Sequence, residues 1–167
     1  MHCPNPQPGL RVATNDAKLV VLLVDDDPDC RMLVRDSIES SGIDPNNLDV
    51  HEAASGEEAL AFLESVDDAH PRPNLIYMDM EMPGIGGMET LRRIKASENL
   101  KQIPIVMLTG VASDLAMKRA AAFGANSYTV KPADAERLIE TVLASSDYWL
   151  RVHQAPGHHL PQEQARR

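Results

Sequence analysis

The chain has 167 residues, which suits one domain of ordinary size with short tails and leaves no room for a second domain of similar size. Its formal net charge of −9 argues against direct DNA binding, which relies on clustered lysine and arginine. Because the apolar stretches are far shorter than the roughly 20 residues of a membrane span, and the N-terminus lacks an apolar signal region, we expect a cytoplasmic protein that binds neither nucleic acid nor membrane.

Residues 1–17 are rich in proline and show no apolar periodicity, so we expect a flexible lead-in. From 18 to 146, short apolar runs alternate with helical patterns. The runs span 19–24, 48–53, 74–79, 103–109 and 126–130, and the helical patterns span 28–41, 56–66, 86–98, 113–123 and 134–146. Continuous apolar strands separated by amphipathic helices predict an α/β domain, in which helices cover both faces of a five-stranded parallel sheet.

Several helix starts are marked by their residue types. The segment from Ser55 to Glu58 has the pattern of a capping box, Pro28 stands where a first-turn proline is tolerated, and Ser113 is suited to cap the fourth helix.

Residues 147–167 form a C-terminal extension to this domain. Tyr148 and Trp149 follow the fifth helix, where they can cap the core. The remainder contains a histidine cluster at His158 and His159, for which disorder is a simpler reading than metal binding. The two cysteines, Cys3 and Cys30, suggest free thiols rather than a disulfide framework or a zinc site.

Polar groups follow the apolar runs at four places. Asp25 and Asp26 come after the first strand, Asp79 after the third, Thr109 ends the fourth and Lys131 follows the fifth. Because parallel sheets gather ligand groups outside the carboxyl ends of their strands, we expect these side chains to share one site.

The expected site has the groups needed for phosphoryl transfer. The Asp79 carboxylate is a usable nucleophile that can form an acyl phosphate. Carboxylates of Asp25, Asp26 and Asp79 suit Mg²⁺, and Lys131 and Thr109 can donate hydrogen bonds to phosphoryl oxygens. Each residue alone has a plainer explanation as a cap, a turn former or a solvated charge. Their joint placement at four strand ends favours a site.

The segment from 18 to 146 resembles the receiver domain of two-component response regulators, the CheY-like family. The resemblance implies a doubly wound, flavodoxin-like fold with strand order 2-1-3-4-5. It rests on four motifs: Val24-Asp25-Asp26-Asp27-Pro28, Met78-Asp79-Met80-Glu81-Met82-Pro83-Gly84, Leu108-Thr109-Gly110 and Val130-Lys131-Pro132.

The resemblance also implies roles for these residues. Asp79 would be the phosphoacceptor, and Mg²⁺ would be held by Asp25, Asp26, Asp79 and the backbone carbonyl of Glu81. The chain would not be an enzyme with turnover on an external substrate, but a phosphoacceptor that assists its own phosphorylation and dephosphorylation.

Two further residues would complete the site and its switch. Thr109 and Lys131 would contact the phosphoryl group, and Tyr128 would be the aromatic switch residue whose ring turns inward as Thr109 moves. A half-buried strand aromatic is the plainer alternative for Tyr128.

Some details of the family pattern can be carried over as expectations. The family's Lys-Pro peptide is cis, which implies a cis bond between Lys131 and Pro132. Gly87 stands where the family has a turn glycine with a permissive backbone. Gly110 replaces a more usual alanine, and Glu81 and Val111 occupy variable positions that leave the phosphoryl lifetime open.

A narrower resemblance links the chain to the stand-alone regulators paired with bacterial phytochromes. It rests on Pro71-Arg72-Pro73-Asn74-Leu75-Ile76, Asn99-Leu100-Lys101-Gln102-Ile103-Pro104 and Tyr148-Trp149-Leu150. It implies a sensor histidine kinase, and more narrowly a bacteriophytochrome, as the phosphodonor. It also implies a homodimer formed by the fourth helix, fifth strand, fifth helix and C-terminal extension.

Three other functions fit parts of the pattern. Phosphatases of the haloacid dehalogenase type use similar residues, but they begin with their nucleophile, whereas here the acid pair comes first. A flavin carrier needs a phosphate-cradling loop, and the acids at 25–27 would repel an anion there. A phosphate-independent adaptor with a receiver-like fold stays open.

Overall fold

The computed structural model describes residues 18–66 and 71–153. In these ranges five strands alternate with five α-helices, as expected. The strands are β1 (Leu19–Val24), β2 (Leu48–Ala53), β3 (Leu75–Met78), β4 (Ile105–Thr109) and β5 (Ser127–Val130). The helices are α1 (Pro28–Glu39), α2 (Gly56–Glu64), α3 (Gly86–Ala96), α4 (Asp114–Ala122) and α5 (Ala135–Asp147).

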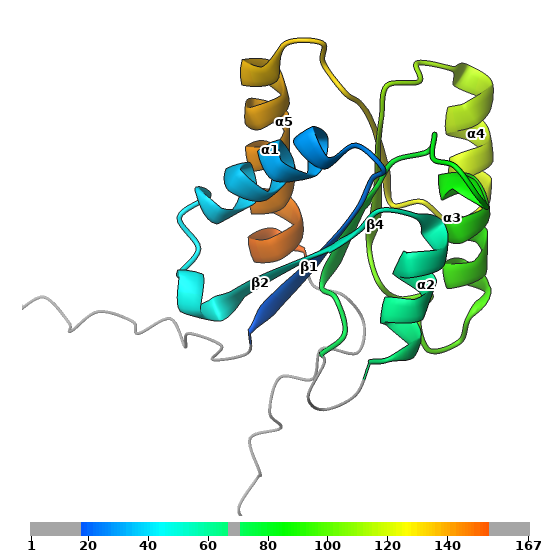
Figure 1. Ribbon diagram of the computed structural model, residues 1–167, viewed down its shortest axis with the longest axis horizontal. Coiled ribbons are helices and arrows are strands. Elements are labelled where there is room, and N and C mark those ends of the chain that lie inside the picture. The colour runs from blue at the N-terminus through cyan, green and yellow to red at the C-terminus, as the bar shows by residue number, and fades with distance from the viewer. Residues whose placement is uncertain (1–17, 67–70, 154–167) are drawn as a thin grey trace, which may run out of the picture.

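All five strands are parallel and lie in the order β2-β1-β3-β4-β5, which confirms the expected topology. Figure 1 shows α1 and α5 on one face of the sheet and α2, α3 and α4 on the other. The chain therefore forms three layers, with the sheet in the middle.

The core lies on both faces of the sheet because successive strand residues point in opposite directions. In β1, Leu22 and Val24 pack toward α2, α3 and α4, whereas Val21 and Leu23 pack toward α1 and α5. All four of these side chains are buried. This two-sided burial explains why the central strands read as continuous apolar runs.

The helix starts follow the expected chemistry. Pro28 is the first residue of α1, and the hydroxyl of Ser113 accepts a hydrogen bond from the amide of Ala116 in α4. At α2 the Ser55 hydroxyl accepts from the Glu58 amide at 3.1 Å. The Glu58 carboxylate, however, accepts from the amide of Ala54 rather than from that of Ser55, so the capping box closes one residue earlier than its usual form.

The start of the C-terminal extension packs back onto the domain. Tyr148–Val152 form a π-helical turn that continues α5. Leu150 is buried in the core beneath α1 and α5, Trp149 packs against the same core, and Tyr148 is half exposed. Arg151 Nη2 donates to the backbone carbonyl of Ser41 at 2.9 Å, which ties this turn to the loop after α1.

The expectations for 1–17 and for the histidine cluster in 154–167 lie outside the described residues. Within 18–66 and 71–153, none of the helices combines the length and the apolar character that crossing a membrane requires.

Lys95, near the end of α3, fastens two loops that lead into strands. Its ammonium donates to the carbonyls of Lys101 and Ile103 at 3.1 and 2.7 Å and to Asn126 Oδ1 at 2.9 Å. Burial lowers the pKa of Lys95 to about 8, so the side chain is mostly charged at pH 7.

We expect Lys95→Met to lower the free energy of unfolding by about 2 kcal/mol at pH 7, because it removes the three hydrogen bonds that the ammonium donates. The matched control is Lys101→Met, which removes only the exposed pair with Glu98 and costs less than about 1 kcal/mol. Urea unfolding followed by Trp149 fluorescence measures both. Equal losses in the two variants would contradict the fastening role of Lys95.

Candidate functional site

The ends of four strands bring the expected polar side chains together. Asp25 directly follows β1, Asp79 follows β3, Thr109 is the last residue of β4, and Lys131 follows β5. Backbone hydrogen bonds fix these ends: the amide of Asp79 donates to the carbonyl of Val24 at 2.8 Å, and the amide of Lys131 donates to that of Thr109 at 2.7 Å. The carboxyl edge of the sheet is thus the site.

Three carboxylates and one ammonium lie at its centre. Asp25, Asp26 and Asp79 each offer an oxygen within 4.8 Å of the others. Lys131 Nζ lies 2.5 Å from Asp25 Oδ2 and 3.3 Å from Asp79 Oδ2. Asp25 and Asp79 are 7% and 8% exposed, whereas Asp26 is open to solvent. The site is therefore an acidic cluster with one partly buried cation.

The negative charges of this cluster change the pKa of Lys131. Burial of the ammonium opposes its charge, but the hydrogen bond that it donates to Asp25 and the negative charges of Asp25 and Asp79 raise the pKa of Lys131 above its ordinary value. Lys131 is thus charged throughout the physiological range and is held against the carboxylates.

The carboxylates fit a hard divalent cation. All three carry oxygen ligands, and the exposed Asp26 leaves the solvent side open for the waters that such ions retain. Three carboxylates against one ammonium leave an excess of negative charge, which a divalent cation would offset. The donor set therefore suits divalent-metal binding.

Thr109 and Tyr128, the expected switch residues, are joined through Val111. The Thr109 side chain is fully buried, and its hydroxyl accepts from the Val111 amide at 3.3 Å. The Tyr128 hydroxyl donates to the Val111 carbonyl at 2.7 Å. Burial first, and then the negative charges of Glu81 and Asp79, raise the pKa of Tyr128. The same residue of the β4–α4 loop thus contacts both side chains.

Two expectations need correction. The peptide between Lys131 and Pro132 is trans, since the described residues contain no cis bond. Trans is the more stable isomer, and the flexible lysine stem reaches both carboxylates from it. Gly87 is needed for a different reason from the one expected: its φ is not positive, but a Cβ there would lie 1.9 Å from the carbonyl oxygen of Asp79. Close approach, not backbone freedom, requires this glycine.

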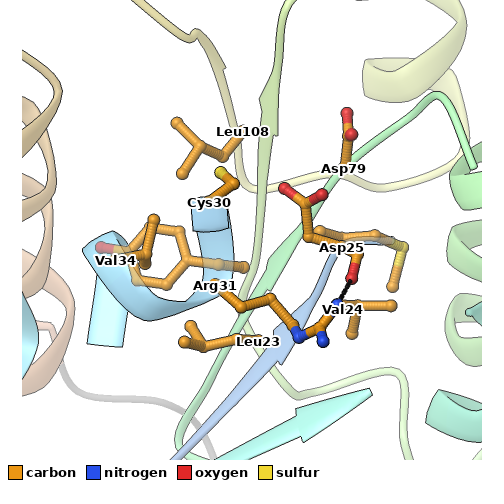
Figure 2. A pocket seen from close by; sticks show the side chains of 10 residues that line it. Leu23, Val24, Asp25, Cys30, Arg31, Val34, Asp79 and Leu108 are labelled. Carbon is orange, nitrogen blue, oxygen red and sulfur yellow. Dashed lines mark hydrogen bonds between the residues drawn. The ribbon is translucent and has the colours of Figure 1, made fainter. Parts of the chain in front are cut away.

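Two α1 residues beside the site had no predicted role. Figure 2 shows Cys30 and Arg31 lining a small pocket together with Asp25 and Asp79. Burial, followed by the hydrogen bond to Asp25, raises the pKa of the Cys30 thiol to about 11, so it stays protonated at neutral pH. Arg31 donates from Nη1 to the backbone carbonyl of Asp25 at 2.5 Å. The sequence indicated a role for Arg31 only through its position shortly after the acids, at the start of α1.

The comparisons with known proteins agree with this geometry. A family model described as the response regulator receiver domain matches residues 21–143. The chain is 33% identical over 139 residues to the probable methanogenesis regulatory protein FilR2 of Methanothrix harundinacea, covering 83% of this chain and 88% of that one. It is 30% identical over 146 residues to the response regulator Rcp1 of Synechocystis sp., covering 86% and 97%.

Solved structures of response regulators have the same fold. The phosphorylated cyanobacterial phytochrome response regulator RcpA superposes with a TM-score of 0.77 at 26% identity, covering 84% of this chain and 99% of that one. The Mn²⁺-bound form of Rcp1 superposes with a TM-score of 0.75 at 31% identity, covering 83% and 99%. On its sequence match, fold and strand-end site, the chain belongs to the family of response regulator receiver domains.

Proposed function

We propose that this protein is a single-domain response regulator in which Asp79 accepts a phosphoryl group from a phosphohistidine of a sensor histidine kinase. The observation that carries the proposal is the grouping of Asp79 with two further carboxylates and with Lys131, whose ammonium lies 3.3 Å from Asp79 Oδ2. Phosphoryl transfer to a carboxylate requires a nucleophilic oxygen, a fixed cation beside it and ligands for a divalent metal ion.

In the proposed reaction a carboxylate oxygen of Asp79 attacks phosphorus, and the bond between phosphorus and the imidazole nitrogen breaks. The imidazole nitrogen that loses phosphorus takes up a proton, so the leaving group is neutral imidazole. Asp79 becomes an acyl phosphate. Lys131 stabilises one phosphoryl oxygen, and the Thr109 hydroxyl donates to another after releasing the Val111 amide. Mg²⁺, held by Asp25, Asp26, Asp79 and the backbone carbonyl of Glu81, would offset the charge of the remaining oxygens.

We further propose that the link through Val111 carries the signal outward. When Thr109 turns toward the phosphoryl group it gives up the Val111 amide, which changes the loop that also accepts the Tyr128 hydroxyl. Ring movement of Tyr128 would then alter the surface formed by α4, β5 and α5. Leu115 and Val130 are exposed there, 68% and 40%, and are suited to a phosphorylation-dependent homodimer contact.

The domain boundaries and partner are part of the same proposal. The receiver spans 18–146, with 1–17 as an N-terminal tail and 147–167 as an extension whose half-exposed Tyr148 adds to the dimer contact. Similarity to the cyanobacterial phytochrome response regulator RcpA supports a bacteriophytochrome as the kinase. Because histidine kinases draw their phosphate from ATP, the cytoplasm is the compartment in which the reaction would run.

The experiment is incubation with acetyl phosphate and Mg²⁺, followed by intact mass and gel filtration. We expect a mass gain of one phosphoryl group that needs the cation, together with a larger apparent size. Asp79→Asn should gain none, whereas the control Asp29→Asn, which changes an exposed acid of α1, should behave as wild type. A wild-type chain that gains no mass would contradict the proposal, and sustained turnover of a phosphate monoester would identify a phosphatase instead.

A further inference from the structure

Arg31 holds the backbone of the acidic loop. Its Nη1 donates to the carbonyl oxygen of Asp25 at 2.5 Å, as the dashed line in Figure 2 shows. Its side chain is only 15% exposed. The Asp25 amide, in turn, donates to the carbonyl of Ala53 at 3.1 Å. Both backbone groups of Asp25 are therefore fixed, one by the end of β2 and the other by Arg31.

The bond to this one carbonyl affects two acids. The carbonyl of Asp25 and the amide of Asp26 belong to the same planar peptide unit. A hydrogen bond that holds this plane therefore restricts one backbone torsion of each acid, and with it the direction in which each side chain leaves the backbone. Asp25 and Asp26 supply two of the three carboxylates in the cluster. No side chain of the cluster itself restrains this peptide through its carbonyl.

Arg31 is in turn held in place by Glu52 of β2. Arg31 Nε donates to Glu52 Oε2 at 3.0 Å, and Arg35 Nε donates to Glu52 Oε1 at 2.6 Å. Burial opposes the charge of Glu52, but the hydrogen bonds from Arg35 and Arg31 hold the pKa of this carboxyl below its ordinary value. The carboxylate is thus ionised and uses both oxygens, and it fixes the guanidinium of Arg31 from the side away from the site.

We propose that Arg31 is a positioning residue that orients the peptide between Asp25 and Asp26 and thereby pre-organises the divalent-cation site. The inference rests on the proposed function, since it concerns the ligands of that site. Arg31 contacts neither the cation nor the phosphoryl group. Arg31 acts through the backbone, and Glu52 keeps the Arg31 guanidinium oriented toward the Asp25 carbonyl.

The positioning role and the charge of Arg31 predict opposite effects on metal affinity. A positive charge beside an acidic cluster repels an incoming cation, so removing the charge alone would tighten binding. Losing the hydrogen bond to the Asp25 carbonyl frees the ligand loop and weakens binding. Removing a partner that orients metal ligands commonly costs 10–100-fold in affinity. The direction of the change therefore separates the two roles.

The test compares three variants of the whole chain by calorimetric titration with Mn²⁺. Arg31→Met removes the charge and the donors, and Arg31→Lys keeps the charge but lacks the planar fork that reaches the Asp25 carbonyl and Glu52 together. Arg35→Met is the matched control, because Arg35 pairs with the same Glu52 but has no bond to Asp25. Thermal unfolding in EDTA verifies that each variant is folded.

We expect about tenfold weaker Mn²⁺ binding for Arg31→Met and Arg31→Lys, and a change of less than about twofold for Arg35→Met. In EDTA the amide resonance of Asp26 should shift in both Arg31 variants and stay in place in Arg35→Met. Unchanged or tighter binding by Arg31→Met, or wild-type affinity in Arg31→Lys, would overturn the inference while leaving the proposed function intact. Wild-type protein that bound no Mn²⁺ would contradict the proposed function and the inference with it.

Discussion

Replacing Lys131 with methionine is expected to lower the free energy of unfolding by about 3 kcal/mol in EDTA. Lys131 Nζ lies 2.5 Å from Asp25 and 3.3 Å from Asp79, and both carboxylates are largely buried. Without the ammonium, two neighbouring carboxylates stay desolvated and repel each other. Breaking a buried pair by removing one partner costs more than the intact pair contributes, because the charge left behind is uncompensated.

Mg²⁺ should reverse much of this loss. A cation that binds the folded state alone stabilises it more when it binds more tightly, and the variant site is more negative than the wild-type site. We therefore expect excess Mg²⁺ to raise the unfolding midpoint of Lys131→Met more than that of wild type, as followed by circular dichroism. The control is Lys18→Met, whose exposed pair with Asp49 contributes less than about 1 kcal/mol with or without Mg²⁺. An Mg²⁺ effect that was equal in wild type and Lys131→Met would contradict the expectation that Lys131 and the cation neutralise the same carboxylates.

Replacing Gly87 with alanine is expected to cost about 3 kcal/mol or more and to disturb the site at the same time. A Cβ at this position would lie 1.9 Å from the Asp79 carbonyl oxygen and 2.8 Å from the Cα of Met80. These are backbone atoms, so no side-chain rotation can relieve the overlap. Either α3 or the strand end that carries Asp79 must move.

Gly110 provides the contrasting variant on the other side of the site. A Cβ at Gly110 would meet nothing within 4 Å, and its φ is not positive. Gly110→Ala should therefore leave stability unchanged or raise it by about 0.4–1 kcal/mol, because alanine restricts the unfolded chain. Urea unfolding of the two variants measures the difference. A Gly87→Ala protein as stable as Gly110→Ala would show that the turn after β3 can shift without cost.

The architecture was predictable because local patterns and the tertiary structure agree. Strand runs at 19–24 and 48–53 coincide with β1 and β2 residue for residue. For the central strand β1, burial on both faces leaves the apolar signal uninterrupted. The site was predictable for a related reason. In a parallel sheet every strand ends at the same edge. The residues after each apolar run can therefore be predicted to lie close together, even when the conformations of the loops are unknown.

The contacts that sequence patterns missed depend on side-chain reach. Arg31 binds the Asp25 carbonyl and Glu52 because β2 lies beside β1, and the match between one guanidinium and two acceptors from different elements leaves no periodic signal. The reason for Gly87 was missed likewise. Its requirement comes from the close approach of the α3 start to the Asp79 carbonyl, which only the packed structure reveals.

The most direct test of the account is to identify the phosphorylated residue chemically. An acyl phosphate is reduced by borohydride to an alcohol, which converts an aspartyl phosphate into homoserine. After treatment with acetyl phosphate and Mg²⁺, reduction and tandem mass spectrometry, the account predicts homoserine at position 79 and unmodified aspartate at positions 25 and 26. Homoserine at another position, or a fully unmodified Asp79 after the same treatment, would contradict the claim that this carboxylate is the phosphoacceptor.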